Sequence, residues 1–502
     1  MNVARLLARS GRLAADRPAL LSGTRAVSRY DRLAADVAAM AGALRNRHGL
    51  APGDRVLLAM GNAPAYVEAL FACWHAGLIA VPVNAKLHER EIAYILDHSG
   101  ARLVFAGPDL AATVNAALAH AADARPQVVE VGGADWQALK AGDPLPVHDA
   151  APTDPAWLFY TSGTTGRPKG ATLTHRNLLA MTAAYAMDLD AIAPGDCLLH
   201  AAPMSHGSGL YILPHVAAGA AQAVPESGRF DPAEVLSLLP GLPGTTMFLA
   251  PTMVRRLVHC PEAGGADSRT LKTIVYGGAP MYREDCREAL ALFGPKLAQI
   301  YGQGESPMTI SVLPKRLHAD TAHPRYDERL GSVGYGFGLV ELRIADADDR
   351  PLPAGGTGEI LVRGDTVMAG YWRDEAASAE SLRGGWLHTG DLGVLDGDGF
   401  LTLKDRSKDV IISGGSNIYP REVEEVLLTH PAVAEVAVVG RPHPDWGEEV
   451  VAFVVALPEA ALPRRSSPLR STGCASGPSP ASSVRRTTAW WKRCRRTITA
   501  RC

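Results

Sequence analysis

Apolar residues recur along the chain in two alternating patterns, short continuous runs and longer amphipathic segments. Residues 54–77 begin with the apolar run DRVLLAM and continue with helical spacing, and residues 271–305 show the order of strand, helix and strand. This alternation is typical of a layered α/β domain, in which helices cover the faces of a largely parallel sheet. The first part of the chain is therefore predicted to be a large α/β domain.

The pattern changes from about residue 331 onward, where glycines interrupt the apolar runs. Short strands at 339–346, 358–364 and 399–405 are separated by turn signals, which indicates a mostly β subdomain. A helix is then expected over 420–429, followed by two strands between 432 and 457. These last elements predict a small C-terminal α+β domain.

Length and composition fit a globular protein of several domains. The 502 residues exceed one ordinary domain, and 47% of them are hydrophobic. No apolar stretch approaches the roughly 20 residues that span a bilayer, so no integral membrane contact is expected. The seven cysteines form no CxxC pair, which argues against a zinc site or a disulfide framework and favours a cytoplasmic location. Arginines among leucines in residues 1–18 faintly suggest a transit peptide, but an amphipathic surface helix is the preferred interpretation.

The end of the chain differs in composition from the rest. Residues 461–502 contain ten Lys or Arg and no Asp or Glu. Subtracting those ten from the 50 basic residues leaves 40 bases against 52 acids, a net charge of −12 for the remainder. The segment is dense in Ser, Pro and Arg and lacks hydrophobic periodicity. It is not expected to continue the fold that precedes it.

The strongest local signal is YTSGTTGRPKG, residues 160–170, which ends an apolar run. Glycine lets the backbone approach a polyphosphate closely, hydroxyl groups donate to phosphate oxygens, and Lys169 supplies a mobile positive charge. The spacing is not that of a Walker loop, and a generic surface loop is the alternative interpretation. The composition of this segment therefore indicates a phosphate-binding site.

Further motifs follow this loop: PMSHGSG, YGGAP, YGQGE, WLHTGDLG and DRSKDVIISGGSNIYPREVE. Together they resemble the adenylate-forming superfamily of acyl-CoA synthetases, aryl-CoA ligases, luciferases and peptide-synthetase adenylation domains. The resemblance extends from about Val3 to about Leu457. It implies an N-terminal adenylate-forming domain over residues 1–406 and the start of a small mobile C-terminal domain over 407–460. It also implies a reaction in which a carboxylate attacks the α-phosphate of ATP and the thiol of coenzyme A then displaces AMP.

The resemblance implies a set of nucleotide-binding residues. The phosphates would be held by Thr161, Ser162, Gly163, Thr164, Thr165, Gly166 and Lys169. The adenine and acyl pocket would be lined by Gly278, Ala279 and Pro280, with Tyr301 stacked on the adenine and Gly302 and Gln303 in the same motif. Asp391 would accept hydrogen bonds from the ribose hydroxyls, with Arg406 as its basic partner. For Asp391, a turn residue before Gly393 is the alternative interpretation.

The candidate catalytic residues are Lys169, His206 and Glu305. Glu305 is the expected Mg²⁺ ligand, because this ion prefers a few hard oxygen donors and takes further ligands from substrate phosphates. The alternative interpretation of Glu305 is a surface glutamate. His206 corresponds to a residue at the mouth of the acyl pocket, although a lone histidine is often structural. The superfamily usually has Thr where Gly304 stands, which puts one phosphate contact in doubt; Gln303 or Ser306 could replace it.

Three residues belong to the expected movement of the small domain. By resemblance, Lys408 lies at the hinge about which that domain swings between adenylation and thioester formation. Gly414 and Gly415 match a loop that lines the pantetheine tunnel after the swing, and an ordinary turn is the alternative interpretation.

Codon degeneracy predicts a frameshift in the unusual C-terminal segment; a divergent tail, or a basic tail that binds nucleic acid or a membrane, is the alternative interpretation. Relatives end in a basic loop of the type PKNxxGKVLK, whose lysine contacts the acyl carboxylate and phosphate, and this chain has no such loop. Permitted codons for residues 492–502, read from the third base, spell ALPKNNYGKV, and residues 482–491 can give FKRPKDYGVVE upstream. A frameshift is therefore predicted, with the catalytic lysine codon divided between Ala500 and Arg501. We expect adenylation by this chain to be impaired.

The leading hypothesis is an acyl-CoA or aryl-CoA ligase that uses ATP, Mg²⁺ and coenzyme A to activate a fatty or aromatic acid. A carrier-protein-loading adenylation enzyme and an inactive nucleotide-binding remnant are the alternatives. The expected partners are the small carboxylic acid, ATP and coenzyme A, with no nucleic acid. The protein is expected to be a monomer or homodimer.

Overall fold

The computed structural model describes residues 1–161, 167–279, 281–406, 409–413, 416–428, 430, 432–444 and 446–456. The chain forms two compact units. The first comprises Met1–Leu342, Leu361–His388 and Asp398–Leu401, and the second comprises Arg343–Ile360, Thr389–Gly397 and the chain from Thr402 onward. The second unit thus also contains segments between residues 343 and 397, which precede the domain boundary at residue 406 expected from the sequence. The basic segment 461–502 lies outside the described residues.

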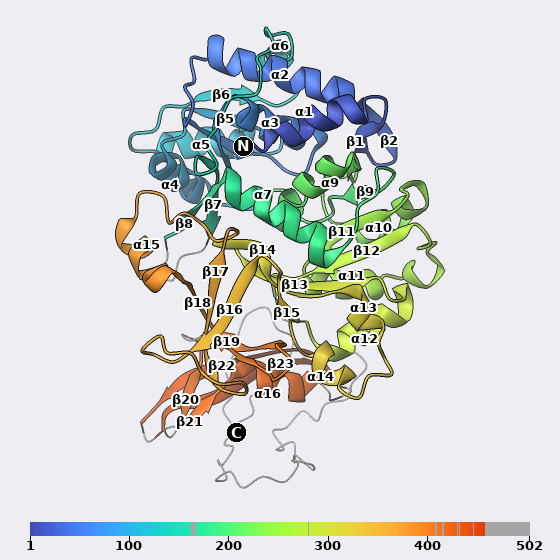
Figure 1. The fold of residues 1–502 in the computed structure, drawn as a ribbon, viewed down its shortest axis with the longest axis vertical. Helices are drawn as coiled ribbons and strands as arrows, with labels where there is room; N and C mark the ends of the chain where they lie inside the picture. The colour runs from blue at the N-terminus through green and yellow to red at the C-terminus, as the bar shows by residue number, and fades with distance from the viewer. Residues whose placement is uncertain are drawn as a thin grey trace. The chain divides into compact units, whose positions relative to one another are not determined.

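Two sheets form the body of the first unit (Figure 1). The six-stranded sheet has the order β6-β5-β3-β4-β7-β8 and is parallel except for the β7–β8 pair. Its strands are β3 (Arg55–Ala59), β4 (Ile79–Pro82), β5 (Leu103–Ala106), β6 (Gln127–Glu130), β7 (Pro155–Thr161) and β8 (Lys169–Thr174).

The nine-stranded sheet has the order β15-β14-β13-β12-β11-β9-β10-β1-β2 and is antiparallel only toward its two ends. Its strands are β1 (Pro18–Ser22), β2 (Arg25–Arg29), β9 (Cys197–Leu199), β10 (Ala221–Val224), β11 (Thr245–Leu249), β12 (Leu271–Tyr276), β13 (Leu297–Gln303), β14 (Ser306–Leu313) and β15 (Tyr335–Gly336). The layered α/β fold predicted from the sequence is therefore confirmed.

Helices of the first unit pack against these sheets. They are α1 (Ala4–Leu13), α2 (Tyr30–Asn46), α3 (Pro64–His75), α4 (Glu89–Ser99), α5 (Ala111–His120), α6 (Ala134–Leu139), α7 (His175–Ala184), α8 (Gly207–Leu210), α9 (Ile212–Ala218), α10 (Pro232–Leu238), α11 (Pro251–Val258), α12 (Arg283–Phe293), α13 (Lys315–Ala319), α14 (Tyr326–Leu330) and α15 (Glu375–Ser381). A π-helical turn, Tyr185–Leu189, continues α7, and short 3-10 turns occupy Leu239–Gly241, Ala263–Gly265 and Arg383–Gly385.

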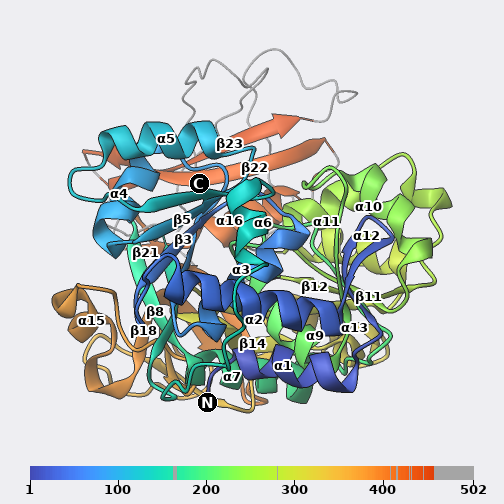
Figure 2. The ribbon, with the colours of Figure 1, turned by 90° about the horizontal axis from the view of Figure 1, so that it is seen from above.

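The first helix is an integral part of this unit. Val3 and Leu7 are buried, and the Ser10 hydroxyl donates a hydrogen bond to the Val216 carbonyl at 2.6 Å. Figure 2 shows α1 beside α2 and α9, which it contacts. The amphipathic helix preferred from the sequence is thus confirmed. No helix in the described part of the chain is long and apolar enough to cross a membrane.

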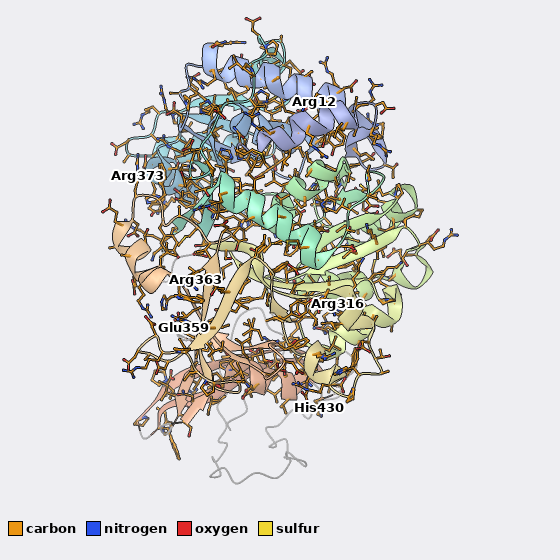
Figure 3. The ribbon with its side chains drawn as sticks, in the orientation of Figure 1. Arg12, Arg316, Glu359, Arg363, Arg373 and His430 are labelled. Carbon is orange, nitrogen blue, oxygen red and sulfur yellow. The ribbon has the colours of Figure 1, made fainter. Side chains whose placement is uncertain are left out.

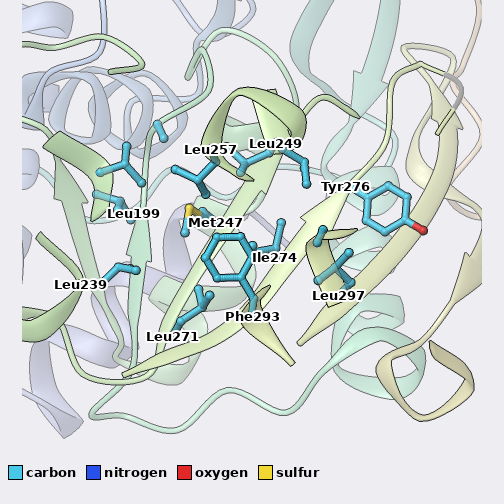
Figure 4. Close-up of a cluster of buried hydrophobic side chains, with 14 of the residues drawn as sticks. Leu199, Leu239, Met247, Leu249, Leu257, Leu271, Ile274, Tyr276, Phe293 and Leu297 are labelled. Atoms are coloured by element: carbon cyan, nitrogen blue, oxygen red, sulfur yellow. The ribbon is translucent and has the colours of Figure 1, made fainter. Parts of the chain in front are cut away.

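A hydrophobic core lies between each sheet and its helices. In the nine-stranded sheet, Met247 and Ile274 pack against Leu257 of α11 and Phe293 of α12 (Figure 4). In the six-stranded sheet, the strand residues Leu57 and Val104 pack against Ile92 and Ile95 of α4 and against Val114 of α5. Each fully buried side chain of this size contributes about 1.5–3 kcal/mol to folding. The two cores fix the strand ends from which the site residues project.

Two four-stranded sheets follow in the chain. The first has the order β16-β17-β18-β19, with strands Val340–Ala345, Thr357–Gly364, Leu387–Leu395 and Leu401–Arg406. The second has the order β21-β20-β23-β22 and contains β20 (Ile411–Ser413), β21 (Ser416–Ile418), β22 (Val433–His443) and β23 (Gly447–Ala456). Helix α16 (Pro420–Leu428) packs Val423 and Leu427 against its core of Ile411, Val438 and Val450. The β subdomain and the small α+β domain predicted from the sequence are both present.

Candidate active site

The phosphate-loop motif connects the last two strands of the six-stranded sheet. Thr161 at the end of β7 pairs with Lys169 at the start of β8. Ser162, Gly163, Thr164, Thr165 and Gly166 lie outside the described residues. The described residues on the two sides of the loop are therefore direct partners in the sheet.

A segment distant in sequence lines the free edge of β8. The Thr172 N–H donates to the Gly370 carbonyl at 2.9 Å, and the Trp372 N–H donates to the Gly170 carbonyl at 2.8 Å. The Asn177 amide holds the start of this segment by donating to the carbonyls of Asp365 and Val367 at 2.8 and 2.7 Å. Asn177 is itself fixed at the beginning of α7 by reciprocal hydrogen bonds with Thr174. These backbone contacts bring Tyr371 next to the loop.

Glu305 lies at the centre of the resulting cluster. Its carboxylate Oε1 accepts hydrogen bonds from the Tyr371 hydroxyl at 2.8 Å and from the Thr161 hydroxyl at 3.3 Å. The ammonium of Lys169 lies 5.1 Å from the centroid of the Tyr371 ring. Burial, together with the adjacent Glu305 carboxylate, raises the pKa of Tyr371, so its hydroxyl remains a proton donor at neutral pH. Thr161, Lys169 and Glu305, chosen from three places in the sequence, are thus brought together.

The environment of Glu305 suits a hard cation. Its side chain is 9% exposed and, within the described residues, it has hydroxyl partners but makes no ion pair. A buried carboxylate without a cationic partner is costly, so a bound cation would offset its charge. No group of three potential metal ligands occurs among the residues that were placed. One carboxylate, completed by water and substrate phosphates, is a usual donor set for Mg²⁺, so the residues fit this ion.

Gly304 is packed closely by the strand that precedes the loop. A Cβ atom added at Gly304 would lie 2.5 Å from Thr161 Cγ2 and 2.7 Å from Phe159 Cδ1. A threonine at this position would therefore displace one of the two side chains. The neighbouring Ser306 is fully buried, and its hydroxyl lies 3.2 Å from the Thr366 hydroxyl. Of the two proposed substitutes for the missing threonine hydroxyl, Ser306 is therefore already engaged.

His206 precedes α8 and contacts the strand that leads to the phosphate loop. Its ring meets the Phe159 ring edge to face, with centroids 5.5 Å apart, and its Nδ1 atom is hydrogen-bonded to the Ser205 hydroxyl at 2.8 Å. Burial lowers the pKa of His206, which keeps the imidazole neutral at pH 7. Gly209, three residues later, must lack a side chain, because a Cβ atom there would lie 1.7 Å from the Met204 carbonyl oxygen.

The YGQGE motif forms the end of β13 and the turn into β14. The pairing of these strands shifts register between Tyr301 and Gln303, as at a β-bulge. Gly302 is required here because an added Cβ atom would lie 2.7 Å from the Met308 backbone nitrogen. Met308 itself has a positive φ of 63°, an uncommon conformation for a residue other than glycine.

The remaining predicted residues are spread over the chain. Gly278 and Ala279 are exposed after β12, and Gly278 has a φ of +83° with nothing within 4 Å of an added Cβ atom. Pro280, Lys408, Gly414 and Gly415 lie outside the described residues. Asp391 belongs to the second unit, where its N–H donates to the Thr389 hydroxyl at 3.1 Å, and Arg406 is the last residue of β19.

Comparison with known proteins identifies the family. The model for the AMP-binding enzyme family matches residues 7–372, and that for the AMP-binding enzyme C-terminal domain matches residues 422–470. The chain belongs to the AMP-binding enzyme family. The adenylate-forming resemblance seen in the sequence is thereby confirmed.

Relatives of this AMP-binding enzyme are ligases. A fatty acid–[acyl-carrier-protein] ligase, ScoC, from Streptomyces coeruleorubidus is 38% identical over 448 residues, which cover 88% of this chain and 84% of ScoC. A feruloyl-CoA synthase from an Amycolatopsis species is 40% identical over 428 residues, covering 85% of this chain and 83% of the synthase. The crystal structure of ATP-bound MatB from Rhodopseudomonas palustris superposes with a TM-score of 0.81 at 29% identity, covering 92% of this chain and 90% of MatB.

Sequence reasoning missed two residues of the site of this AMP-binding enzyme. Tyr371 donates to Glu305 from a position 66 residues further along the chain, and Phe159 separates Gly304 from His206. No local pattern marks either residue. Arg373, labelled in Figure 3, follows this segment with a positive φ of 53°, so the backbone turns sharply immediately after Tyr371 and Trp372.

Proposed function

We propose that this AMP-binding enzyme derives from an ATP-dependent ligase of carboxylic acids and coenzyme A. The acid, fatty or aromatic, would be converted to an acyl-adenylate with release of pyrophosphate, and coenzyme A would then displace AMP to form the thioester. The observation that carries this proposal is the cluster of Thr161, Lys169, Glu305 and Tyr371 beside the phosphate loop. The cluster combines a cation, hydroxyl donors and a carboxylate that can bind a metal ion at one point.

Each residue of the cluster would have a separate task. Lys169 would neutralise the β- and γ-phosphates together with the loop hydroxyls, and Glu305 would hold Mg²⁺ against them. When bound, the ion would supply charge neutralisation for the phosphates. Tyr371 and Thr161 would hold Glu305 in one orientation through hydrogen bonds to a single oxygen, so that preorganisation is already present before ATP enters.

The other assignments remain part of the proposal. His206, neutral and beside Phe159, would guard the entrance for the acid rather than transfer a proton. Asp391 and Arg406 would bind the ribose, and Tyr301, Gly302, Gln303, Gly278, Ala279 and Pro280 would surround the adenine. Lys408 would be the hinge, and Gly414 and Gly415 would line the tunnel for pantetheine.

A carrier protein is the second candidate acceptor. The relative ScoC is a fatty acid–[acyl-carrier-protein] ligase, whereas the other relative named above is a feruloyl-CoA synthase. Both acceptors would present a thiol to the same acyl-adenylate, so the first half-reaction does not discriminate between them. Measuring thioester formation with coenzyme A and with a phosphopantetheinylated carrier protein separates the two candidates.

We infer that the chain in its present form is impaired in adenylation. The lysine that would meet the acyl carboxylate and phosphate is missing, and the loss of such a contact to a transition state costs about 10²–10³ in rate. The test compares the chain with a version in which the reading frame is restored over residues 461–502, so that residues 482–502 read FKRPKDYGVVEALPKNNYGKV. Pyrophosphate release dependent on a panel of acids should rise at least about 100-fold on restoration. Equal rates in the two chains would refute the impairment, and no acid-dependent release by the restored chain would refute the ligase assignment.

A further inference from the structure

Helix α4 carries two ring side chains that contact the phosphate loop at both of its ends. The His98 ring is hydrogen-bonded through Nδ1 to the Tyr160 hydroxyl at 2.8 Å, and the two rings meet edge to face with centroids 5.8 Å apart. The guanidinium carbon of Arg167 lies 6.0 Å from the centroid of the Tyr94 ring, within the range of a cation–π interaction. Tyr160 precedes the loop and Arg167 follows it, so one helix contacts the chain on both sides of the loop.

Tyr94 and His98 also contact each other, and we call them the α4 ring pair. Residues four apart share one face of a helix, and the two rings are stacked with centroids 5.4 Å apart and an angle of 15° between their planes. Tyr94 also packs against the hydrophobic core of the six-stranded sheet. Stacking and core packing together restrict the rotamers of these side chains. The α4 ring pair is therefore a preformed support for Tyr160 and Arg167.

The same end of α4 holds the segment that contains Tyr371. Arg373 donates a hydrogen bond from Nη1 to the His98 carbonyl at 3.2 Å. Arg55 donates to two further carbonyls at the end of α4, at 2.8 and 2.7 Å, where a positive charge also opposes the helix dipole. The Trp372 ring lies 5.6 Å from the Arg55 guanidinium carbon and 5.9 Å from that of Arg373. The phosphate loop and the segment of Tyr371 are thus attached to one helix end.

Both partners of the hydrogen bond between His98 and Tyr160 are neutral at pH 7. Burial lowers the pKa of His98, the positive charge of Arg373 acts in the same direction, and Asp374 opposes them. Burial raises the pKa of Tyr160, so its hydroxyl keeps its proton. The contact is therefore an uncharged hydrogen bond, which orients a side chain with a modest net energy. Such a bond suits the positioning of Tyr160 better than it suits proton transfer.

The residue next to His98 makes a contact of a different kind. The Asp97 carboxylate accepts hydrogen bonds from the N–H groups of residues 122, 123 and 124 at 2.8, 3.1 and 2.8 Å. These partners belong to the connection after α5 and not to the phosphate loop. Two adjacent side chains of α4 therefore have separable roles: Asp97 attaches the helix to the connection after α5, and His98 attaches the phosphate loop to the helix.

We propose that the α4 ring pair positions the phosphate loop for ATP, so that Tyr94 and His98 are positioning residues for the first half-reaction. His98 fixes Tyr160 before the loop, and Tyr94 fixes Arg167 after it. A binding loop whose ends are held before the ligand enters loses less conformational freedom on binding, which raises the affinity. This inference rests on the proposed ligase function and adds to it a role of α4 that acts through the loop.

Calorimetric titration of the full chain with ATP in the presence of Mg²⁺ tests this proposal. His98→Leu and Tyr160→Phe should each weaken ATP binding by about 3–10-fold, because each removes the same neutral hydrogen bond. The double variant should bind ATP no more weakly than either single variant, since the shared interaction is already lost. Tyr94→Leu should weaken ATP binding by about 2–5-fold, whereas Tyr94→Phe, which keeps the face of the ring, should retain the affinity of the unchanged chain.

Asp97→Asn is the matched control, because it weakens a contact of α4 that does not involve the ring pair. It should lower the melting temperature and leave the affinity for ATP unchanged. An unchanged affinity of His98→Leu, additive losses in the double variant, or an equal loss of affinity in Asp97→Asn would overturn the positioning role while leaving the ligase proposal intact. Failure of the unchanged chain to bind ATP would overturn both.

Discussion

Acidification should destabilise the first unit strongly, because four of its histidines are neutral and almost completely buried. His175, His200, His215 and His318 are at most 2% exposed. Burial lowers the pKa of His200 to about 3 and of the other three to about 4. Their hydrogen bonds also depend on the neutral ring: the Val3 N–H, for example, donates to His175 Nδ1 at 3.2 Å.

The direction in which acid changes the stability follows from these lowered pKa values. In the unfolded chain these rings have a pKa of about 6.5, so between about pH 6.5 and 4 the unfolded state binds more protons than the folded state. The stabilisation is fully present above pH 6.5 and is lost as the pH falls toward 4. At pH 5.5 the loss of unfolding free energy is about 1.4 kcal/mol for each ring, or about 6 kcal/mol for the four rings together. Glu68 and Asp285, whose pKa values burial raises, offset a part of this loss.

This loss is comparable with the total stability of an ordinary domain, about 5–15 kcal/mol. We therefore expect the first unit to unfold at about pH 5. Urea unfolding followed by tryptophan fluorescence between pH 7.0 and 5.5 measures the effect. His318→Gln should reduce the loss of unfolding free energy between pH 7.0 and 5.5 by about 1.2 kcal/mol. A free energy that stays constant or rises on acidification would show that these rings are protonated or solvated in the folded protein.

Three further predictions concern the site. Glu305→Gln should weaken binding of ATP in the presence of Mg²⁺ by about 10–100-fold. Tyr371→Phe should weaken it by about 10-fold, because hydrogen bonds to a carboxylate contribute about 1.5–3 kcal/mol. An unchanged ATP affinity of the Glu305 variant in calorimetry would show that Glu305 does not bind the metal. Gly209→Ala should lower the free energy of unfolding by at least about 3 kcal/mol, because the added Cβ atom clashes with the Met204 carbonyl. Gly195→Ala is the control: its Cβ atom meets open space, so the free energy should change by less than about 1 kcal/mol. Equal melting temperatures of the two variants would contradict this. Gly304→Thr should weaken ATP binding, and the additional change Phe159→Leu should restore it; additive losses in the double variant would show that Phe159 is not the obstacle.

The sequence alone was sufficient for the fold and the family. The order of apolar runs and amphipathic segments predicted the layered α/β body, and β3, α3 and β4 follow it in the structure. Local periodicity suffices here because each element buries one face, and that requirement is written into consecutive residues. The phosphate-loop composition likewise indicated nucleotide chemistry, because close backbone approach and hydroxyl donors are local properties.

The partners of the site residues depended on tertiary structure. Tyr371 reaches Glu305 because the segment after Asp365 pairs with the edge of β8, and edge pairing leaves no signature in the sequence of either segment. The crowding at Gly304 by Thr161 and Phe159 arises where strands of two different sheets meet. Tyr94 and His98 contact the two ends of the phosphate loop through packing that no local pattern encodes. Residue types in sequence specify which chemistry is available, whereas long-range packing decides which groups meet.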